Sequence, residues 1–408
     1  MNIRTNDDYV PDYVKPEQVI NFDIYTDEGL RQDPHLGFRA ICNKASDILY
    51  TPRNGGHWIV TRFDLMTEIL RDTEHFSNRE LDIPKSNSPN VMIPLNLDPP
   101  DHTKYRVVLM RYFDKKTVGE MEPTLRMWAN RLIDQVIDNR GCDFAESLGP
   151  GFPVSVFMEM MGLPLERFEE FRGIVHEYFG KTTVERRIEL QNTIFSLIDD
   201  LIGERRRERR NDLVSKLLDE QVRGRPLTQE ELQSIGFLLF IAGLDTVANA
   251  LTFAFRHLAQ DQSLQDRLAL EPARIPDFVE EALRRYAVVN QTRIVKKDVD
   301  IDGASFREGD MVLCPLTLAG MDDRKNPEPD RFDLDRKGRE HHTFSTGPHI
   351  CIGNILARAE MRIFTEEWLK RIPSFRVAAN AKLEWRPGLV MALMHLPLEW
   401  NVSGRSAS

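Results

Sequence analysis

The sequence predicts a mainly α-helical protein with a minor β portion, and three observations support this. From about residue 101 to residue 286, apolar residues recur three and four positions apart, which is the spacing of amphipathic helices. One apolar run, from Thr228 to about Ala259, contains no proline and is long enough for a helix of roughly 45 Å. Strand-like alternation is confined to short segments, chiefly 290–314.

The first half of the chain is expected to begin irregularly and then become helical. Residues 1–50 contain no long periodic segment and predict short helices and loops. The sequence HWIVT at 57–61 follows two glycines and predicts a strand that leaves a turn. The segment 77–101 is rich in Pro, Asn and Ser, so we expect a long loop, and loops of this length usually serve a function. Helices are expected near 101–112, 122–139, 165–179, 185–208 and 212–221.

The second half begins with the long helix. Thr228 and Glu231 have the spacing of a capping box, which marks its first turn. A turn is expected at Asp302-Gly303, and a long loop over 320–350. Further helices are expected near 275–286 and 353–371, and strands over 290–314 and 374–400. Because no linker, repeat or low-complexity tract interrupts the chain, we expect one domain over residues 1–408.

Composition excludes several classes of protein. The 408 residues carry 54 basic and 64 acidic side chains, a net charge of −10, which argues against a dedicated nucleic-acid binder. The N-terminus lacks the apolar run of a signal peptide, and no stretch is expected to span a membrane. The four cysteines are far apart and follow no disulfide spacing. These features predict a soluble cytoplasmic protein.

The segment FSTGPHICIG at 344–353 is the first candidate for chemistry. Cys351 stands just before a predicted helix, whose N-terminal N–H groups and dipole favour a thiolate. Gly347 and Gly353 would let backbone approach the sulfur or a flat ligand closely. A thiolate metal ligand is therefore predicted, with a buried structural cysteine as the alternative. A zinc site made by His341, His342, His349 and Cys351 is a further alternative, although the spacing fits no regular zinc pattern.

The second candidate is the segment AGLDT at 242–246, in the middle of the long helix. A mid-helix glycine costs about 1 kcal/mol relative to alanine. Gly243 is followed by the acid Asp245 and the hydroxyl of Thr246, in a segment apolar enough to be buried. Buried ionisable groups are costly unless they have a partner or a function. We therefore expect a buried site, and the alternative is one exposed polar pair.

Two further pairs are less specific when taken alone. Glu281 and Arg284 have the spacing of an ordinary ion pair on a helix surface. His102 and Arg106 lie four residues apart on a predicted helix face, where two cations could hold a carboxylate. The alternative for this second pair is a solvated basic face.

Together these motifs resemble the cytochrome P-450 family of haem-thiolate monooxygenases. The matches are Phe344-x-x-Gly347-x-x-x-Cys351-x-Gly353 with Ala357, the segment 242–246, Glu281-x-x-Arg284, and Arg331 within NPEPDRFDLDR. The segments GGHWIVTR, HFS, GLDTVANALTF and LPLEW resemble the bacterial camphor-hydroxylase branch. The loop at 83–97 departs from that branch because it lacks the tyrosine that binds camphor there.

The resemblance implies a fold and a set of roles. The fold would be a triangular prism of helices around a buried haem b, iron protoporphyrin IX. Cys351 would be the proximal iron ligand, Thr246 would hydrogen-bond bound dioxygen, and Asp245 would gate protons to it. The positions that match propionate-binding residues are His102, Arg106, Arg293 and His349, and Gly243, Gly353 and Ala357 would also contact the cofactor. The structural triad would be Glu281, Arg284 and Arg331.

The resemblance also implies a substrate pocket and partners. The wall residues would be mostly aliphatic: Asn90, Met92, Leu95, Leu238, Ile241, Leu244, Val289, Asn290, Leu389 and Val390. Such a wall suits a small hydrophobic molecule, and a terpenoid or norisoprenoid ketone, camphor-like or ionone-like, is expected. The protein is expected to be a monomer without nucleic-acid or membrane partners.

The chain has no dinucleotide-binding G-x-G-x-x-G after a strand, so electrons must come from outside. The branch resemblance implies a [2Fe–2S] ferredoxin and its flavin-dependent reductase, and Arg106, Arg111, Lys115 and Lys116 form a basic cluster suited to an acidic ferredoxin. Two alternatives are a peroxygenase driven by hydrogen peroxide and a haem-binding sensor without turnover. The intact Asp245-Thr246 pair disfavours both.

Overall fold

The structure is a computed structural model. It describes residues 9–42, 46–86, 91–179 and 183–401. These residues form two compact units. The first unit comprises the described residues within 1–105, 283–351 and 385–391, and the second comprises those within 106–282, 352–384 and 392–408. Each unit is assembled from three separate segments, so no single cut in the chain divides one from the other.

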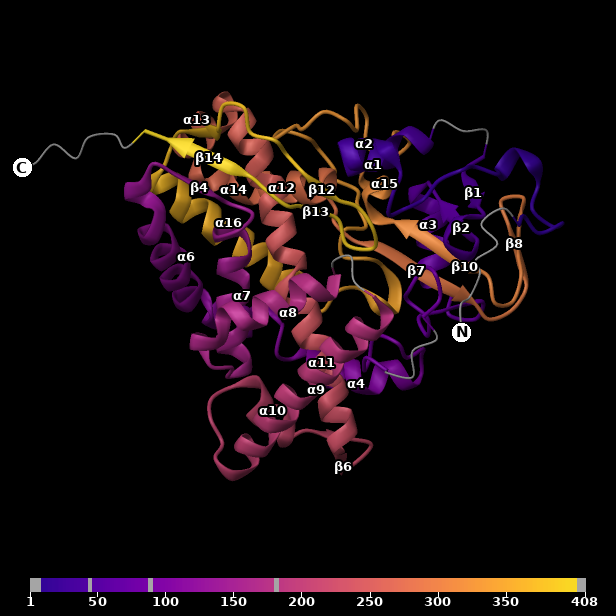
Figure 1. Ribbon diagram of the computed structural model, residues 1–408, viewed down its shortest axis with the longest axis horizontal. Coiled ribbons are helices and arrows are strands. Elements are labelled where there is room, and N and C mark those ends of the chain that lie inside the picture. The colour runs from indigo at the N-terminus through magenta and orange to yellow at the C-terminus, as the bar shows by residue number, and fades with distance from the viewer. Residues whose placement is uncertain (1–8, 43–45, 87–90, 180–182, 402–408) are drawn as a thin grey trace, which may run out of the picture. The chain divides into compact units, whose positions relative to one another are not determined.

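The first unit is built around a sheet. Five strands follow the order β1-β2-β10-β7-β3, in which β2 and β10 are parallel and the other neighbours are antiparallel. The long strands β7 and β10 lie side by side in Figure 1. Its elements are η1 (Pro16–Gln18), α1 (Glu28–Gln32), α2 (Pro34–Ile41), β1 (Ile48–Thr51), η2 (Arg53–Gly55), β2 (His57–Val60), α3 (Phe63–Arg71), β3 (Phe76–Ser77), β7 (Asn290–Val295), β8 (Val299–Ile301), β9 (Ala304–Phe306), β10 (Met311–Pro315), α15 (Leu316–Gly320), η6 (Gly347–His349) and β12 (Trp385–Arg386).

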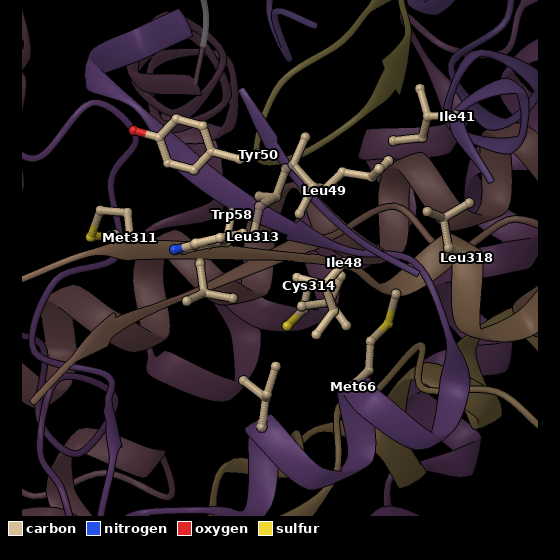
Figure 2. Close-up of a cluster of buried hydrophobic side chains, with 14 of the residues drawn as sticks. Ile41, Ile48, Leu49, Tyr50, Trp58, Met66, Met311, Leu313, Cys314 and Leu318 are labelled. Carbon is tan, nitrogen blue, oxygen red and sulfur yellow. The ribbon is translucent and has the colours of Figure 1, made fainter. Parts of the chain in front are cut away.

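The sheet of the first unit carries a continuous hydrophobic core. Every residue of β1, β2 and β10 is buried, as expected for strands covered on both faces. Trp58 packs edge-on against Tyr50 with ring centroids 5.2 Å apart, and its indole Nε1 donates a hydrogen bond to Asp310 Oδ2 at 2.9 Å. Figure 2 shows how Ile41 of α2, Met66 of α3 and Leu318 of α15 join the strand residues in this core.

The second unit is mainly helical. It contains a three-stranded sheet in the order β11-β14-β4 and a hairpin of β5 and β6. Two helices, α4 (Asp101–Met110) and α14 (Ile275–Arg285), have residues in both units. The elements of the second unit are α5 (Lys115–Glu120), α6 (Glu122–Val136), η3 (Ile137–Asn139), β4 (Gly141–Asp143), α7 (Leu148–Met161), η4 (Leu165–Arg167), α8 (Phe168–Phe179), α9 (Val184–Arg207), α10 (Leu213–Leu218), β5 (Gln221–Val222), β6 (Arg225–Pro226), α11 (Gln229–Leu244), α12 (Thr246–Gln260), α13 (Gln262–Leu270), η5 (Pro272–Arg274), α16 (Asn354–Arg371), β11 (Phe375–Val377), β13 (Ala392–Leu393) and β14 (Pro397–Trp400).

Aromatic side chains from distant segments form the core of the second unit. Phe144 stacks on Phe255 of α12 with centroids 4.4 Å apart, and both rings meet Phe364 of α16 edge-on. Trp368, one turn further along α16, contacts Phe255 with centroids 5.5 Å apart. Aromatic pairs in such geometries add stability beyond the area that they bury. This cluster fixes α12 against α16.

Most predicted elements are confirmed. Helices α3, α5, α7, α13 and α15 were not predicted, and the single long helix expected at 228–259 is divided at Asp245 into α11 and α12. The prediction that no stretch could span a membrane is wrong by length and composition, because Gln229–Gln260 is long and apolar enough. Two thirds of its most apolar window are buried inside the protein, as in a core helix.

Candidate active site

The Cys351 loop folds back on itself. The backbone N–H of Cys351 donates a hydrogen bond to the carbonyl of Phe344 at 2.8 Å, and that of Ile350 donates to Gly347 at 3.2 Å. The Cys351 side chain is exposed, whereas Thr346 and His349 within the same loop are each 7% exposed. Helix α16 begins three residues later, at Asn354. The loop therefore closes on itself and leaves Cys351 exposed, just before a helix N-terminus.

Helix α3 holds this loop in place. The Arg71 guanidinium donates through Nε to Thr346 Oγ1 at 3.0 Å. Gly347 has φ = +73°, and a Cβ atom there would lie 3.1 Å from the carbonyl oxygen of Leu70 and 2.9 Å from Arg71 Cγ. Glycine is required here for two reasons, since the conformation is left-handed and the helix backbone approaches closely. The loop thus rests directly on the last turn of α3.

A histidine nine residues before the cysteine joins the same contact. The His342 ring stacks on Phe63, with centroids 4.0 Å apart and planes inclined by 23°. The Thr67 hydroxyl donates to the Phe63 carbonyl at 2.8 Å, so at 2.7 Å it accepts a hydrogen bond from His342 Nε2. Burial lowers the pKa of His342 to about 4, so this side chain is neutral near pH 7.

These contacts bear on the zinc alternative. His342 uses Nε2 to donate to Thr67, and His349 is a buried ring in contact with His102. Among the described residues, the one group whose possible metal-ligating atoms converge is Asp143, Glu146 and His395, far from Cys351 in sequence. The zinc site proposed for the four residues 341, 342, 349 and 351 is therefore wrong.

Arg293 is a fully buried cation in the middle of β7. Its side chain is 2% exposed, and Nη1 donates to the Thr292 carbonyl at 2.7 Å. Nη2 is buried and has no hydrogen-bond partner among the residues that the structure describes. Burial lowers the pKa of Arg293 to about 10, which still leaves it charged near pH 7. A buried guanidinium with an unused donor fits a ligand carboxylate.

Two buried histidines lie together in the same unit. His102 of α4 is 2% exposed and His349 of η6 is 7% exposed. Their ring centroids are 4.2 Å apart. The structure thus brings together two of the four residues predicted to bind the cofactor carboxylates. Arg106, another residue of this predicted set, lies one helical turn beyond His102 on α4 and is half-buried.

The segment 242–246 forms a break between two helices. Asp245 is the residue at which α11 ends and α12 begins, and the Thr246 hydroxyl donates to the Ala242 carbonyl at 3.1 Å. A hydroxyl that bonds back to the carbonyl four residues earlier loosens and bends a helix. Asp245 and Thr246 are half-buried, and the expectation of a buried site around them stays a prediction.

Gly243 has a packing reason to be glycine. A Cβ atom at this position would lie 2.4 Å from Cδ2 of Phe157, which belongs to α7. The missing side chain therefore allows α11 and α7 to approach closely within the second unit. This contact explains why position 243 is glycine, and no ligand is needed for the explanation. The assignment of Gly243 to the cofactor site stays a prediction.

Comparison with known proteins decides the family. The sequence model described as Cytochrome P450 matches residues 145–275 and 275–382. This chain belongs to the cytochrome P450 family. It is 34% identical to a probable cytochrome P450 127A1 from Sinorhizobium fredii over 98% of both chains. It is 28% identical to a steroid C26-monooxygenase from Mycobacterium tuberculosis over 88% of this chain and 99% of that one.

Solved structures agree with the sequence relatives. The crystal structure of CYP101J2 has a TM-score of 0.89 and 35% identity, and covers 97% of this chain and 100% of its own. That of CYP101C1 has a TM-score of 0.88 and 31% identity over 96% and 100%. The predicted P450 fold is confirmed. The protein is a P450 monooxygenase of bacterial type, and its cofactor is haem.

The residues of this P450 fit a haem. A propionate carboxylate matches the unused, buried Nη2 of Arg293, and Cys351 is exposed in a loop in which Ser345, Thr346 and His349 are buried. Past Cys351, the N–H of Ala357 donates to the Gly353 carbonyl at 2.9 Å in the first turn of α16. Gly353 and Ala357 thus form the helix start that was predicted after the ligand.

The residues of the predicted substrate wall belong to both units, and their place in a common pocket stays a prediction. In the first unit, Val289 forms a β-bridge with Val390, and the Asn290 N–H donates to the Leu389 carbonyl at 2.8 Å. Met92 begins a turn in which its own N–H donates to Asn96 Oδ1 at 2.8 Å, and Leu95 is half-buried beside Asn96. On α11, the residues Leu238, Ile241 and Leu244 are 8%, 7% and 3% exposed. Asn90 lies outside the described residues.

Asn290 has a structural partner. Its Nδ2 donates to the Gly388 carbonyl at 2.6 Å, which ties β7 to the segment 385–391. Because side chains alternate along a strand, Asn290 faces the opposite side of β7 from Gln291 and Arg293. The predicted contact of Asn290 with substrate stays a prediction.

The predicted structural triad needs one correction. Arg284 is fully buried and donates to the carbonyls of Gly320, Pro329 and Arg331, at 2.7, 2.9 and 3.1 Å. The Arg331 side chain is 62% exposed and pairs with Glu328 at 3.5 Å. Arg331 therefore takes part through its backbone, and its predicted side-chain role is wrong.

Sequence reasoning missed the residues that support the Cys351 loop, namely Thr67 and Arg71 of α3 and Gln291 of β7. A signal for α3 was present, since Met66, Ile69 and Leu70 have helical spacing and are its buried residues. Alternation along β7 could also have placed Gln291 on the same side as Arg293. No local signal indicates that α3 and the Cys351 loop are in contact.

Proposed function

We propose that this P450 hydroxylates a small, largely aliphatic molecule such as a terpenoid or norisoprenoid, with electrons from a [2Fe–2S] ferredoxin. The aliphatic character of the predicted wall carries the substrate proposal. Leu238, Ile241, Leu244, Val289, Leu389 and Val390 offer dispersion contacts and no charge. The motifs shared with the camphor-hydroxylase branch support the same substrate class.

Each functional residue has a role within this proposal. Cys351 would ligate the haem iron, while Arg293, His102, Arg106 and His349 would hold the two propionates. When bound, the haem supplies oxygen activation, which a thiolate ligand favours by pushing electron density onto the iron. Thr246 would hold a hydrogen bond on the distal side, and Asp245 would deliver protons there. The helix break at Asp245 supports this role, because it loosens the backbone beside the hydroxyl.

The electron donor would dock on α4 and α5. Val107 and Met110 lie one helical turn apart on α4, and their side chains are 56% and 50% exposed. Two exposed apolar side chains so close together are unusual on a protein surface. Four basic residues lie close to them in the sequence, namely Arg106, Arg111, Lys115 and Lys116. An apolar centre with a charged rim is the usual composition of a protein–protein interface, and the basic charge suits an acidic ferredoxin.

Not all of these cations are equally available to a partner. Arg111 forms an ion pair with Glu220 at 3.1 Å, and Lys116 lies 4.0 Å from Glu120. Lys115 is exposed and has no ion pair among the described residues. Lys115 is therefore the cleanest single probe of docking. A protein of this kind would act in the cytoplasm, where a ferredoxin and its reductase are available.

The deciding experiment is a turnover assay with purified protein, ferredoxin, reductase and NADH, preceded by a spectral screen for compounds that shift the Soret band. We expect a terpenoid that shifts the band to give NADH-dependent hydroxylated product. Product formed with hydrogen peroxide but not with NADH would replace this proposal with a peroxygenase. Absence of turnover with either reagent would favour a sensor.

A further inference from the structure

One residue of the Cys351 loop has a backbone conformation that its side chain does not favour. Ser345 has φ = +64°, in the left-handed region. Seven described residues other than glycine have a positive φ, and of these only Ser345 is buried, at 8% exposure. Serine adopts this conformation rarely, and a buried instance persists only when its surroundings enforce it.

Two hydrogen bonds enforce the conformation of Ser345. Its backbone N–H donates to the His342 carbonyl at 2.6 Å. Its hydroxyl donates to Gln291 Oε1, also at 2.6 Å. The first bond is local, but the second joins residues 54 positions apart and links the loop to the sheet.

The partner of Ser345 lies on the strand that carries the buried arginine. In the antiparallel pair of β7 and β10, Gln291 lies opposite Cys314 and Arg293 lies opposite Val312. Because side chains alternate, Gln291 and Arg293 face the same side of β7. The Ser345 hydroxyl thus connects the segment that leads into Cys351 with the strand whose Arg293 fits a haem propionate.

We propose that the Ser345–Gln291 hydrogen bond is a positioning contact for the thiolate, which holds the Cys351 loop in its left-handed turn and protects thiolate ligation of the haem. Neither residue is catalytic in this inference, since each acts through the backbone position of Cys351. The inference rests on the proposed role of Cys351 as the iron ligand. It adds a second support to the contact between the loop and α3.

The test measures how fast the reduced carbon-monoxide complex of the holoenzyme loses its band near ~450 nm, the signature of thiolate ligation. Gln291→Leu removes the acceptor and Ser345→Ala removes the donor, and we expect each to accelerate the loss roughly fivefold or more. Gln291→Glu keeps an acceptor oxygen, so its rate should stay within about twofold of wild type. Ser345→Gly should be slower than Ser345→Ala, since glycine adopts φ = +64° without cost.

A matched control exists in the second unit. Ser374 donates to Gln262 Oε1 at 3.0 Å in an exposed hydrogen bond of the same chemical type. Ser374→Ala should therefore leave the rate unchanged. Cys351→Ser is measured in parallel, because survival of the band in that variant would refute the ligand assignment rather than the positioning role.

Two results would overturn the inference while the ligand assignment stands. One is a wild-type rate of band loss in both Gln291→Leu and Ser345→Ala. The other is an equal acceleration by Gln291→Glu and Gln291→Leu, since a general disturbance of β7 would not distinguish an acceptor from an apolar side chain. Rescue by Gln291→Glu, together with a Ser345→Ala/Gln291→Leu double variant no faster than the worse single variant, would support the inference.

Discussion

Replacement of Gly347 by alanine should destabilise the protein through the contact between the Cys351 loop and α3. Two costs contribute. Alanine at φ = +73° costs ~1–2 kcal/mol in the left-handed region. The new Cβ would also lie 3.1 Å from the Leu70 carbonyl oxygen and 2.9 Å from Arg71 Cγ, and crowding of this kind adds ~1–3 kcal/mol. The expected loss is therefore ~2–5 kcal/mol in the free energy of unfolding.

Gly338 provides the matched control. Its φ is +74°, and a Cβ there would meet no atom within 4 Å. Gly338→Ala should thus lose only the conformational cost of ~1–2 kcal/mol. Denaturant unfolding of the holoprotein measures both variants, and the difference between them isolates the contact with α3. Equal losses of unfolding free energy in Gly338→Ala and Gly347→Ala would refute the reasoning. The contact with α3 would then add nothing to the cost of a side chain at position 347.

Three further outcomes are expected. Thr246→Ala should bind substrate nearly as wild type but divert NADH to hydrogen peroxide, and an unchanged yield of product per NADH would contradict the role of this hydroxyl. Lys115→Glu should slow reduction by ferredoxin and flatten its salt dependence in stopped-flow measurements, whereas wild-type rates at every ionic strength would place docking elsewhere. Burial raises the pKa of Glu360 to about 8, so the folded state holds a proton that the unfolded chain releases above about pH 4.5. Wild-type stability should therefore fall from pH 5 to pH 8 by on the order of a few kcal/mol relative to Glu360→Gln, and parallel pH profiles for the two proteins would contradict this.

Tertiary packing explains where prediction of the fold failed. Helix α7 has the sequence LGPGFPVSVFMEMM, whose glycines and prolines normally interrupt helices. Eleven of its residues are buried, so it lacks the polar face that would reveal a helical period. The break at Asp245 was also missed, because the apolar periodicity continues through it.

The same distinction between local pattern and tertiary contact applies to the candidate site. Cys351, Gly347 and Thr246 could be proposed because each lies in a short contiguous motif. The bond between Thr67 and His342 joins residues 275 positions apart, and no local pattern indicates it. Arg331 was assigned a side-chain role from its motif, but side-chain direction there depends on a turn in which Glu328 has φ = +48°. Contiguous motifs can be found in the sequence, whereas contacts between distant segments require the fold.

The reduced carbon-monoxide spectrum of Cys351→Ser decides whether Cys351 is the haem ligand. This variant should retain haem but lack the band near ~450 nm that thiolate ligation produces. Cys314→Ser is the control, because Cys314 is fully buried in β10 and burial raises the pKa of its thiol to about 12. That control should keep the band. A band that survives in Cys351→Ser, or one that disappears in Cys314→Ser, would contradict the assignment of Cys351 as the haem ligand.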